Sequence, residues 1–139
     1  MGLPLPPTYI VSFRFRRILV PVDGSENSFR ALELAIDFAQ RYGSKVVAIH
    51  AKPKGTETQV PEELRRRFKK HYILIDFKIK EYDPLKSSPA NEILNEIFEG
   101  SYDAVILGAR GTTVNENIQL GSVASAVVFN APITVVIVR

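Results

Sequence analysis

The 139-residue chain contains no cysteine, and this absence removes several kinds of chemistry at once. There can be no disulfide framework, no thiolate nucleophile and no cysteine-ligated metal. The lack of cysteine suits a reducing cytoplasm, which is the location we expect. No apolar run comes close to the roughly 20 residues needed to span a bilayer, so we expect no membrane partner.

The N-terminal segment MGLPLPPTYIVSF lacks a cationic start and a small-residue cleavage site, so we do not interpret it as a secretory signal. We expect residues 1–15 to form an irregular N-terminal arm, or to be an expression remnant. Residues 16–139 are expected to form one domain. Hydrophobic residues make up 45% of the chain and charged residues 24%, which is typical of a globular protein.

Several enzyme signatures are also missing. There is no G-x-S-x-G nucleophile elbow and no G-x-x-x-x-G-K phosphate loop. The two histidines, His50 and His71, lack a metal-ligand spacing. We expect His50 to be packed or hydrogen-bonded at a strand end and His71 to be exposed. No catalytic residue is predicted.

The net charge of +3 is concentrated at 65–67 and 69–70, where five cations cluster. One interpretation is a patch that binds nucleic acid. The other is a short helix in which Glu62 and Glu63 lie near the positive end of the dipole and the cations near the negative end. We favour the helix, so a nucleic-acid partner is not expected.

The rest of the chain alternates strands with helices. Four short runs rich in β-branched residues, at 17–22, 45–51, 104–107 and 133–138, are typical of strands buried on both faces of a parallel sheet. A fifth run, 73–82, alternates apolar and polar residues and predicts a half-exposed strand near a sheet edge. The segment 52–60 is predicted to be a linker.

Three longer helices are predicted from caps and periodicity. Ser25 caps the first, which ends at Gly43; Ser88 and Pro89 open the second, which ends at Gly100; Ser122 begins the third, before Pro132. Their expected inward faces are Phe29, Leu32, Ile36 and Ala39; Ile93, Leu94, Ile97 and Phe98; and Val123, Ala126, Val127 and Phe129.

This order of elements predicts a three-layer α/β sandwich around a five-stranded parallel sheet. In such a sheet, ligands bind beyond the carboxyl ends of the strands, where the strand order reverses. With the strand order 3-2-1-4-5, the ends of the first and fourth strands meet at that point. The segment PVDGS, at 21–25, follows the first strand, and GARGTTVNENIQLGS, at 108–122, follows the fourth.

The second segment has a distinctive glycine spacing: Gly108, two residues, Gly111, nine residues, Gly121 and then Ser122. We expect Gly108 and Gly111 to permit positive φ and close backbone approach to a ligand. The amides at the start of the following helix can bind a phosphate without a lysine. An ordinary connecting loop is the alternative.

ILVPVDGS at 18–25, together with the G-x-x-G-(nine residues)-G-S spacing, resembles the universal stress protein family in its ATP-binding branch. The resemblance extends from about residue 16 to 139. It implies the adenine nucleotide alpha hydrolase-like fold. It further implies a dimer formed through the last strand, from Ile133 to Val138, which would otherwise be a bare edge.

The resemblance also implies which residues hold ATP, or AMP or ADP, with Mg²⁺. Asp23 would lie near the ribose or bind the metal next to the phosphates, and Ala51 would meet the adenine through its backbone. The implied contacts are Pro21, Val22, Asp23, Ala51, Leu107, Gly108, Arg110, Gly111, Gly121, Ser122, Val123 and Ala124. Asp23 as a helix cap and Arg110 as a solvated cation are the alternatives.

The sequence departs from the family pattern in two places. Residues 112–120 contain no basic residue and include Glu116, and the segment between the second and third strands is short. We expect one solvated carboxylate to weaken triphosphate binding by about 1 kcal/mol or less. The hypothesis is a dimeric, ATP-binding regulatory protein of the stress response. The alternatives are an interaction module with an empty or AMP-selective site and a slow ATPase.

Overall fold

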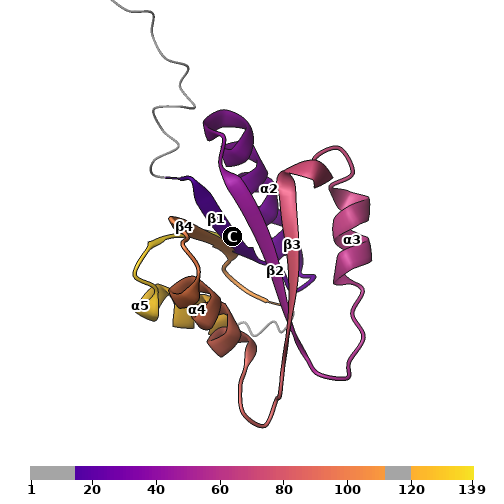
Figure 1. The fold of residues 1–139 in the computed structure, drawn as a ribbon, viewed down its shortest axis with the longest axis vertical. Coiled ribbons are helices and arrows are strands. Elements are labelled where there is room, and N and C mark those ends of the chain that lie inside the picture. Colours follow the sequence, from indigo (N-terminus) through magenta and orange to yellow (C-terminus); the bar gives the residue numbers. More distant parts are fainter. Residues whose placement is uncertain (1–14, 112–119) are drawn as a thin grey trace, which may run out of the picture.

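The computed structural model describes residues 15–111 and 120–139, which form a parallel five-stranded sheet with helices on both faces (Figure 1). The strand order is β3-β2-β1-β4-β5, so the predicted fold class and strand order are confirmed. No helix in this part of the chain is both long and apolar enough to cross a membrane. The elements are β1 (Arg17–Pro21), α2 (Glu26–Tyr42), β2 (Lys45–Pro53), α3 (Val60–Arg67), the 3₁₀ turn η1 (Tyr72–Leu74), β3 (Ile75–Tyr82), α4 (Pro89–Glu99), β4 (Ala104–Gly108), α5 (Ser122–Asn130) and β5 (Thr134–Val138).

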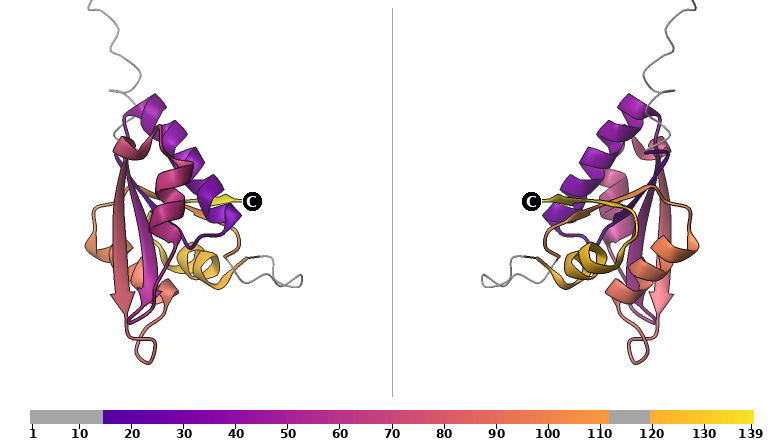
Figure 2. Two further views of the ribbon diagram at one scale, coloured as in Figure 1. Left: turned by 90° about the vertical axis from the view of Figure 1, so that its right-hand side faces the viewer. Right: turned by 90° about the vertical axis from the view of Figure 1, so that its left-hand side faces the viewer.

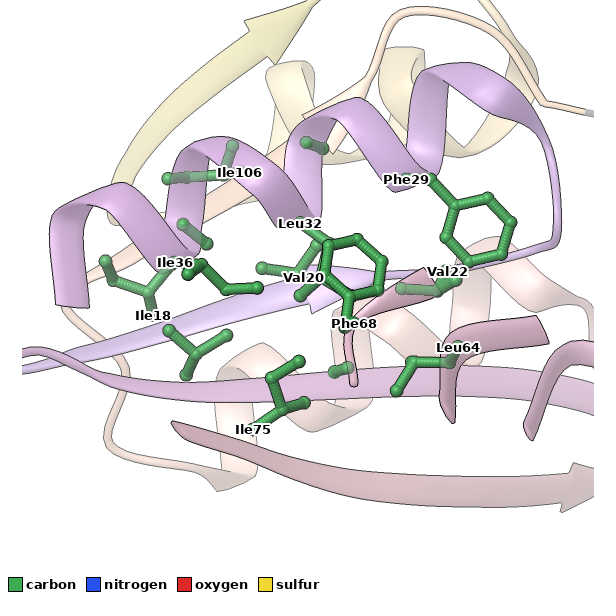
Figure 3. Packing of buried hydrophobic residues seen from close by; sticks show 14 of the residues in the cluster. Ile18, Val20, Val22, Phe29, Leu32, Ile36, Leu64, Phe68, Ile75 and Ile106 are labelled. Atoms are coloured by element: carbon green, nitrogen blue, oxygen red, sulfur yellow. The ribbon is translucent and has the colours of Figure 1, made fainter. Parts of the chain in front are cut away.

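The side chains of each strand alternate between two cores because the sheet is covered on both faces. In Figure 2, α2 and α3 lie on one side of the strands and α4 on the other. Ile18 and Val20 of β1 pack with α2 and α3, whereas Leu19 packs with α4 and α5. Figure 3 shows the first core, in which Phe29 of α2 lies near Phe68, the residue after α3.

The predicted caps are in place. The Ser25 side chain accepts a hydrogen bond from the amide of Ser28 at 3.2 Å, and the Ser88 side chain accepts one from the amide of Asn91 at 3.2 Å. Gly43 ends α2 with φ of 72°, a conformation that favours glycine. Local sequence therefore sets the start and end of α2 and the start of α4.

Some expected positions were wrong. The strand predicted at 73–82 begins at Ile75; Ile73 lies in η1 and is 92% exposed. Phe98 and Phe129, expected to face inward, are 61% and 82% exposed. Each of these two helices buries only a narrow stripe, which Ile93 and Ile97 occupy on α4 and Ala124 and Val127 on α5. At the predicted linker, β2 continues to Pro53.

The two ends of the sequence differ from the central strands. Phe15, assigned above to the arm, packs its ring 5.3 Å from that of Phe38 and 6.0 Å from that of Tyr42. The remainder of the arm lies outside the described residues. β5 lies at the edge of the sheet, so its apolar side chains are half-buried rather than buried on both faces.

The basic segment forms α3 and its C-terminal end, as the dipole interpretation predicts. Glu62 and Glu63 lie in its first turn, and the arginines lie in its last. Arg67 pairs with Glu26 of α2, and the hydrogen bond from its guanidinium holds the pKa of that carboxyl below its usual value. The arginine also lies over the Phe29 ring, 4.5 Å from its centre. This ion pair ties α3 to the start of α2.

Candidate functional site

A pocket of about 640 Å³ opens beyond the carboxyl ends of β1, β2, β3 and β4, at the point where the strand order reverses. All the residues predicted to bind nucleotide line this one pocket, although they come from four separate stretches of the chain. They are Pro21, Val22, Asp23, Ala51, Leu107, Gly108, Arg110, Gly111, Gly121, Ser122, Val123 and Ala124. That they bind a nucleotide stays a prediction.

The turn after β1 places Asp23 at the pocket. Gly24 takes φ of 92°, which reverses the chain before α2. The Asp23 carboxylate accepts hydrogen bonds at Oδ1 from the amide and the hydroxyl of Ser25, at 2.9 and 2.6 Å. Ser25, and not Asp23, is the helix cap, so the capping alternative for Asp23 is wrong. Asp23 instead fixes the turn that leads to the cap.

The turn after β4 approaches this first turn closely. A Cβ on Gly108 would lie 2.8 Å from the Cβ and the carbonyl carbon of Asn27, and one on Gly111 would lie 2.6 Å from Oδ2 of Asp23. Neither glycine has positive φ, so that expectation was wrong. These two glycines are required because the end of β4 meets the first turn of α2 at Asn27 and the turn after β4 meets Asp23, and a side chain would separate them.

The start of α5 lines the pocket next to these two turns. The Gly121 amide donates to the carbonyl of Ala109 at 2.7 Å, which brings the end of the long loop back to β4. Gly121 is the N-cap of α5, and as a glycine it supplies no side-chain cap to this end of the helix. The first amides of α5 thus carry the partial positive charge of a helix start and line the pocket at Ser122, Val123 and Ala124.

The charges at the pocket are few. Among the described residues that line it, Asp23 is the only carboxylate and Arg110 is the only arginine or lysine. No group of three or more metal-ligating side chains occurs in the described part of the chain. A lone carboxylate fits Mg²⁺ that is held mainly by phosphate oxygens and water, because Mg²⁺ commonly takes only one or two carboxylates from a protein. It does not fit a metal held by protein ligands alone.

His50 lines the pocket and connects the residues after β1 to the segment before α3. Its Nδ1 lies 2.8 Å from the carbonyl oxygen of Val22, and its Nε2 lies 2.9 Å from Oγ1 of Thr58. Thr58 in turn accepts a hydrogen bond from the amide of Val60, at the start of α3. The expectation that His50 is packed or hydrogen-bonded is confirmed, whereas His71 is half-buried rather than exposed.

Sequence reasoning missed part of the pocket lining, including all of the lining residues from β3 and α4. The missed lining residues are Ser28, Ile49, His50, Pro53, Tyr82, Pro89, Ile93 and Ala109. Tyr82 ends the alternating strand and Pro89 begins a helix, so both signals were visible. Their distance from the glycine loop along the chain concealed the connection. The loop segment 112–119, with Glu116, lies outside the described residues.

Comparison with known proteins agrees with this geometry. The sequence model of the universal stress protein family matches residues 14–139. The universal stress protein MJ0531 of Methanocaldococcus jannaschii is 28% identical over 140 residues, covering 90% of this chain and 82% of that protein. YxiE of Bacillus subtilis, another universal stress protein, is 29% identical over 147 residues, covering 90% and 99%.

Solved structures share the fold. The universal stress protein UspA from Lactobacillus plantarum matches with a TM-score of 0.71 and 24% identity, over 91% of this chain and 99% of that one. A universal stress protein in complex with cAMP matches with 0.69 and 22%, over 91% and 98%. One from Archaeoglobus fulgidus in complex with dAMP matches with 0.61 and 22%, over 91% and 99%.

Proposed function

The chain belongs to the universal stress protein family, and from that premise we propose that its pocket binds an adenine nucleotide, with ATP as the favoured ligand. The phosphates would lie against the first amides of α5, between the turns after β1 and β4. Nucleotide occupancy would regulate the protein in the stress response. We propose slow ATP hydrolysis at most, because no side chain among the described residues of the pocket is placed as a general base for water.

One observation carries the proposal: the start of α5 has a glycine, which offers no side-chain cap, at its N-cap and lies inside a pocket. Backbone amides at a helix start bind phosphate well, and the glycine at 121 leaves the N-cap of α5 without a side chain. Two solved relatives are described in complex with cAMP and dAMP, which supports an adenine nucleotide as the ligand class.

Asp23 is the proposed partner of Mg²⁺ when a triphosphate is bound. Its Oδ1 accepts hydrogen bonds from Ser25 and its Oδ2 lies toward Gly111, so the carboxylate is at the end of the pocket where the phosphates are proposed. The bound ion would supply charge neutralisation between this carboxylate and the phosphates. Without such an ion, the same carboxylate would repel the phosphates.

We further propose that two copies associate through β5, as the family resemblance implies. The strand lies at the sheet edge and carries the half-exposed side chains of Val135, Val136, Ile137 and Val138. An apolar strand edge presents unpaired backbone groups that a second strand can satisfy. A dimer would leave the nucleotide pocket open, because the pocket is lined by no residue of β5.

A second candidate function is an interaction module that holds AMP or no nucleotide. The observation that favours it is the sparse positive charge: Arg110 is the single arginine or lysine among the described residues that line the pocket. AMP needs fewer positive partners than ATP because it carries fewer phosphate charges. The two candidates therefore predict different changes in nucleotide affinity as the number of phosphates increases.

Heating the purified protein and identifying the released small molecules is the direct test. We expect ATP in near-stoichiometric yield or, for protein freed of nucleotide, a higher melting temperature with Mg-ATP. At one hundred times the Kd the gain is about 2.7 kcal/mol, or about 5–10 °C for a domain of this size. A larger shift with AMP than with Mg-ATP would favour the second candidate.

Replacing Gly121 with Val supplies a site-specific variant. A Cβ there would lie 3.3 Å from the Gly111 amide nitrogen, so the neighbouring backbone must shift by a few tenths of an ångström, and the added methyl groups would occupy the phosphate end. Ala126→Val enlarges another α5 residue, one that does not line the pocket, and is the matched control. ATP affinity that is equal in the two variants would refute the placement of the phosphates.

A further inference from the structure

The pocket has a second wall, built by the part of β2 and β3 that extends past β1. Pairing between β1 and β2 ends at Pro21 and Ile49, whereas pairing between β2 and β3 continues to Pro53 and Tyr82 (Figure 1). The Lys54 amide then donates to the Tyr82 carbonyl at 2.9 Å. A two-stranded ribbon therefore stands beside the pocket.

Tyr82 ends this ribbon on the side of the pocket. It follows Lys78 and Lys80 at even steps along β3, and those lysines pair with Glu96 and Glu92 of α4. Because side chains two apart share a face, Tyr82 lies on the α4 face of the sheet. It is 8% exposed and lines the pocket.

The hydrogen bonding of Tyr82 differs from that of a core tyrosine. In the described part of the chain, the buried Tyr102 donates its hydroxyl to Glu96 at 2.6 Å, while the Tyr82 hydroxyl has no such partner. Buried tyrosines usually satisfy this group. Among the described buried side chains, only Ser44 has an enclosed polar atom without a partner, so the Tyr82 hydroxyl is not sealed in the protein.

The neighbours of Tyr82 at this end of the pocket are flat or apolar. Ala51 and Pro53 come from β2, and Pro89 and Ile93 come from α4. The opposite end, at β4 and α5, carries Asp23, Arg110 and the α5 amides. A ligand with an apolar part at one end and an anionic part at the other therefore suits the whole pocket.

We propose that the ring of Tyr82 packs against the base of the bound nucleotide, so that Tyr82 determines specificity for a nucleotide over a base-free polyphosphate. This inference rests on the proposed function and adds a residue that the family motif does not include. Stacking on an aromatic ring requires the ring face and not the hydroxyl. Tyr82→Phe is therefore expected to bind ATP like the unaltered protein.

The test compares Mg-ATP with Mg-tripolyphosphate, which lacks the base and sugar, on the same proteins by calorimetry. Stacking of one base contributes enough that Tyr82→Ala should weaken ATP binding about 5- to 150-fold. Tripolyphosphate binding should not change, because this ligand would contact only the end of the pocket at α5. Tyr82→Leu keeps a large apolar side chain without a ring, so it tests the loss of stacking if Tyr82→Ala fails to fold.

Tyrosine fluorescence supplies a readout that a purely structural role would not move. The chain has five tyrosines and no tryptophan, so its emission comes from tyrosine. ATP should quench part of this emission, and Tyr82→Phe should remove the quenched part while ATP still binds. Tyr72→Phe removes a tyrosine outside the pocket and should leave the quenching intact.

The outcomes separate the two proposals. If the unaltered protein binds neither ligand, both proposals fail. If it binds ATP and Tyr82→Ala binds ATP equally well, only the role of Tyr82 fails. Equal losses for ATP and tripolyphosphate would mean that Tyr82 supports the whole pocket rather than the base, and this too would overturn the inference.

Discussion

Replacing Tyr102 with Phe tests how α4, which carries one wall of the pocket, is held against the sheet. The Tyr102 hydroxyl donates to Oε2 of Glu96 at 2.6 Å, and both side chains are buried. Lys78 of β3 donates to both oxygens of the same carboxylate, at 3.1 and 3.0 Å, but the lysine side chain is 53% exposed. The carboxylate therefore has one buried partner and one solvated partner.

The relative magnitudes decide which partner matters more. A buried hydrogen bond to a charged group contributes about 1.5–3 kcal/mol, and its loss leaves the carboxylate partly unsatisfied. An ion pair with an exposed lysine contributes about 0–1 kcal/mol because water screens it. We expect Tyr102→Phe to lower the free energy of unfolding by about 1.5–3 kcal/mol, and Lys78→Met by about 1 kcal/mol or less.

Urea unfolding at several pH values is the assay. Burial raises the pKa of Glu96, but the hydrogen bonds from Tyr102 and Lys78 and the lysine charge outweigh it, so the net pKa lies below the usual 4.5. A lowered carboxyl pKa stabilises the fold above the unfolded value, and this stabilisation is lost as the pH falls through the folded pKa. The cost of Tyr102→Phe should therefore shrink below pH 4.5.

Two results would contradict this reasoning. One is a loss for Tyr102→Phe below about 0.5 kcal/mol at neutral pH, which is the range of an ordinary surface substitution. The other is a larger loss for Lys78→Met than for Tyr102→Phe. Either would mean that the exposed lysine, or water, satisfies Glu96 without the tyrosine.

Three further predictions concern the pocket and the edge strand. Gly108→Ala should lower the free energy of unfolding in urea by about 1–3 kcal/mol, because its Cβ would meet the Asn27 backbone. Gly121→Ala, whose nearest contact is at 3.3 Å, should lower it clearly less. Equal losses in the two variants would contradict the close approach of Gly108 to Asn27. Asp23→Asn should weaken ATP binding in Mg²⁺ more than in EDTA by calorimetry, and a loss independent of Mg²⁺ would exclude metal binding by Asp23. Val136→Lys, at the middle of β5, should convert a dimer to a monomer, as measured by light scattering, without loss of ATP binding. An unaltered protein that is already monomeric would refute the dimer.

Much of the fold was predictable because its signals act over a few residues. The caps at Ser25 and Ser88 and the terminator at Gly43 depend on local hydrogen bonds and local dihedral angles, and all three are where the sequence predicts. The strands likewise follow from short apolar runs. For the site, the strand-end motifs at 21–25 and 108–122 carry the family resemblance, and the residues that this resemblance implies all line one pocket.

The kinds of element, their order and the glycines at the strand ends can be inferred from the chain alone, since these depend on near neighbours. The partners that those residues meet follow from the packing of the folded chain. It placed Gly108 against Asn27 and Gly111 against Asp23, left Phe98 and Phe129 exposed, and brought Tyr82 to the pocket. Burial and close approach depend on how far β2 and β3 extend past β1 and on how much of each helix the sheet covers. No local sequence pattern encodes the extension of the strands or the covered part of the helices.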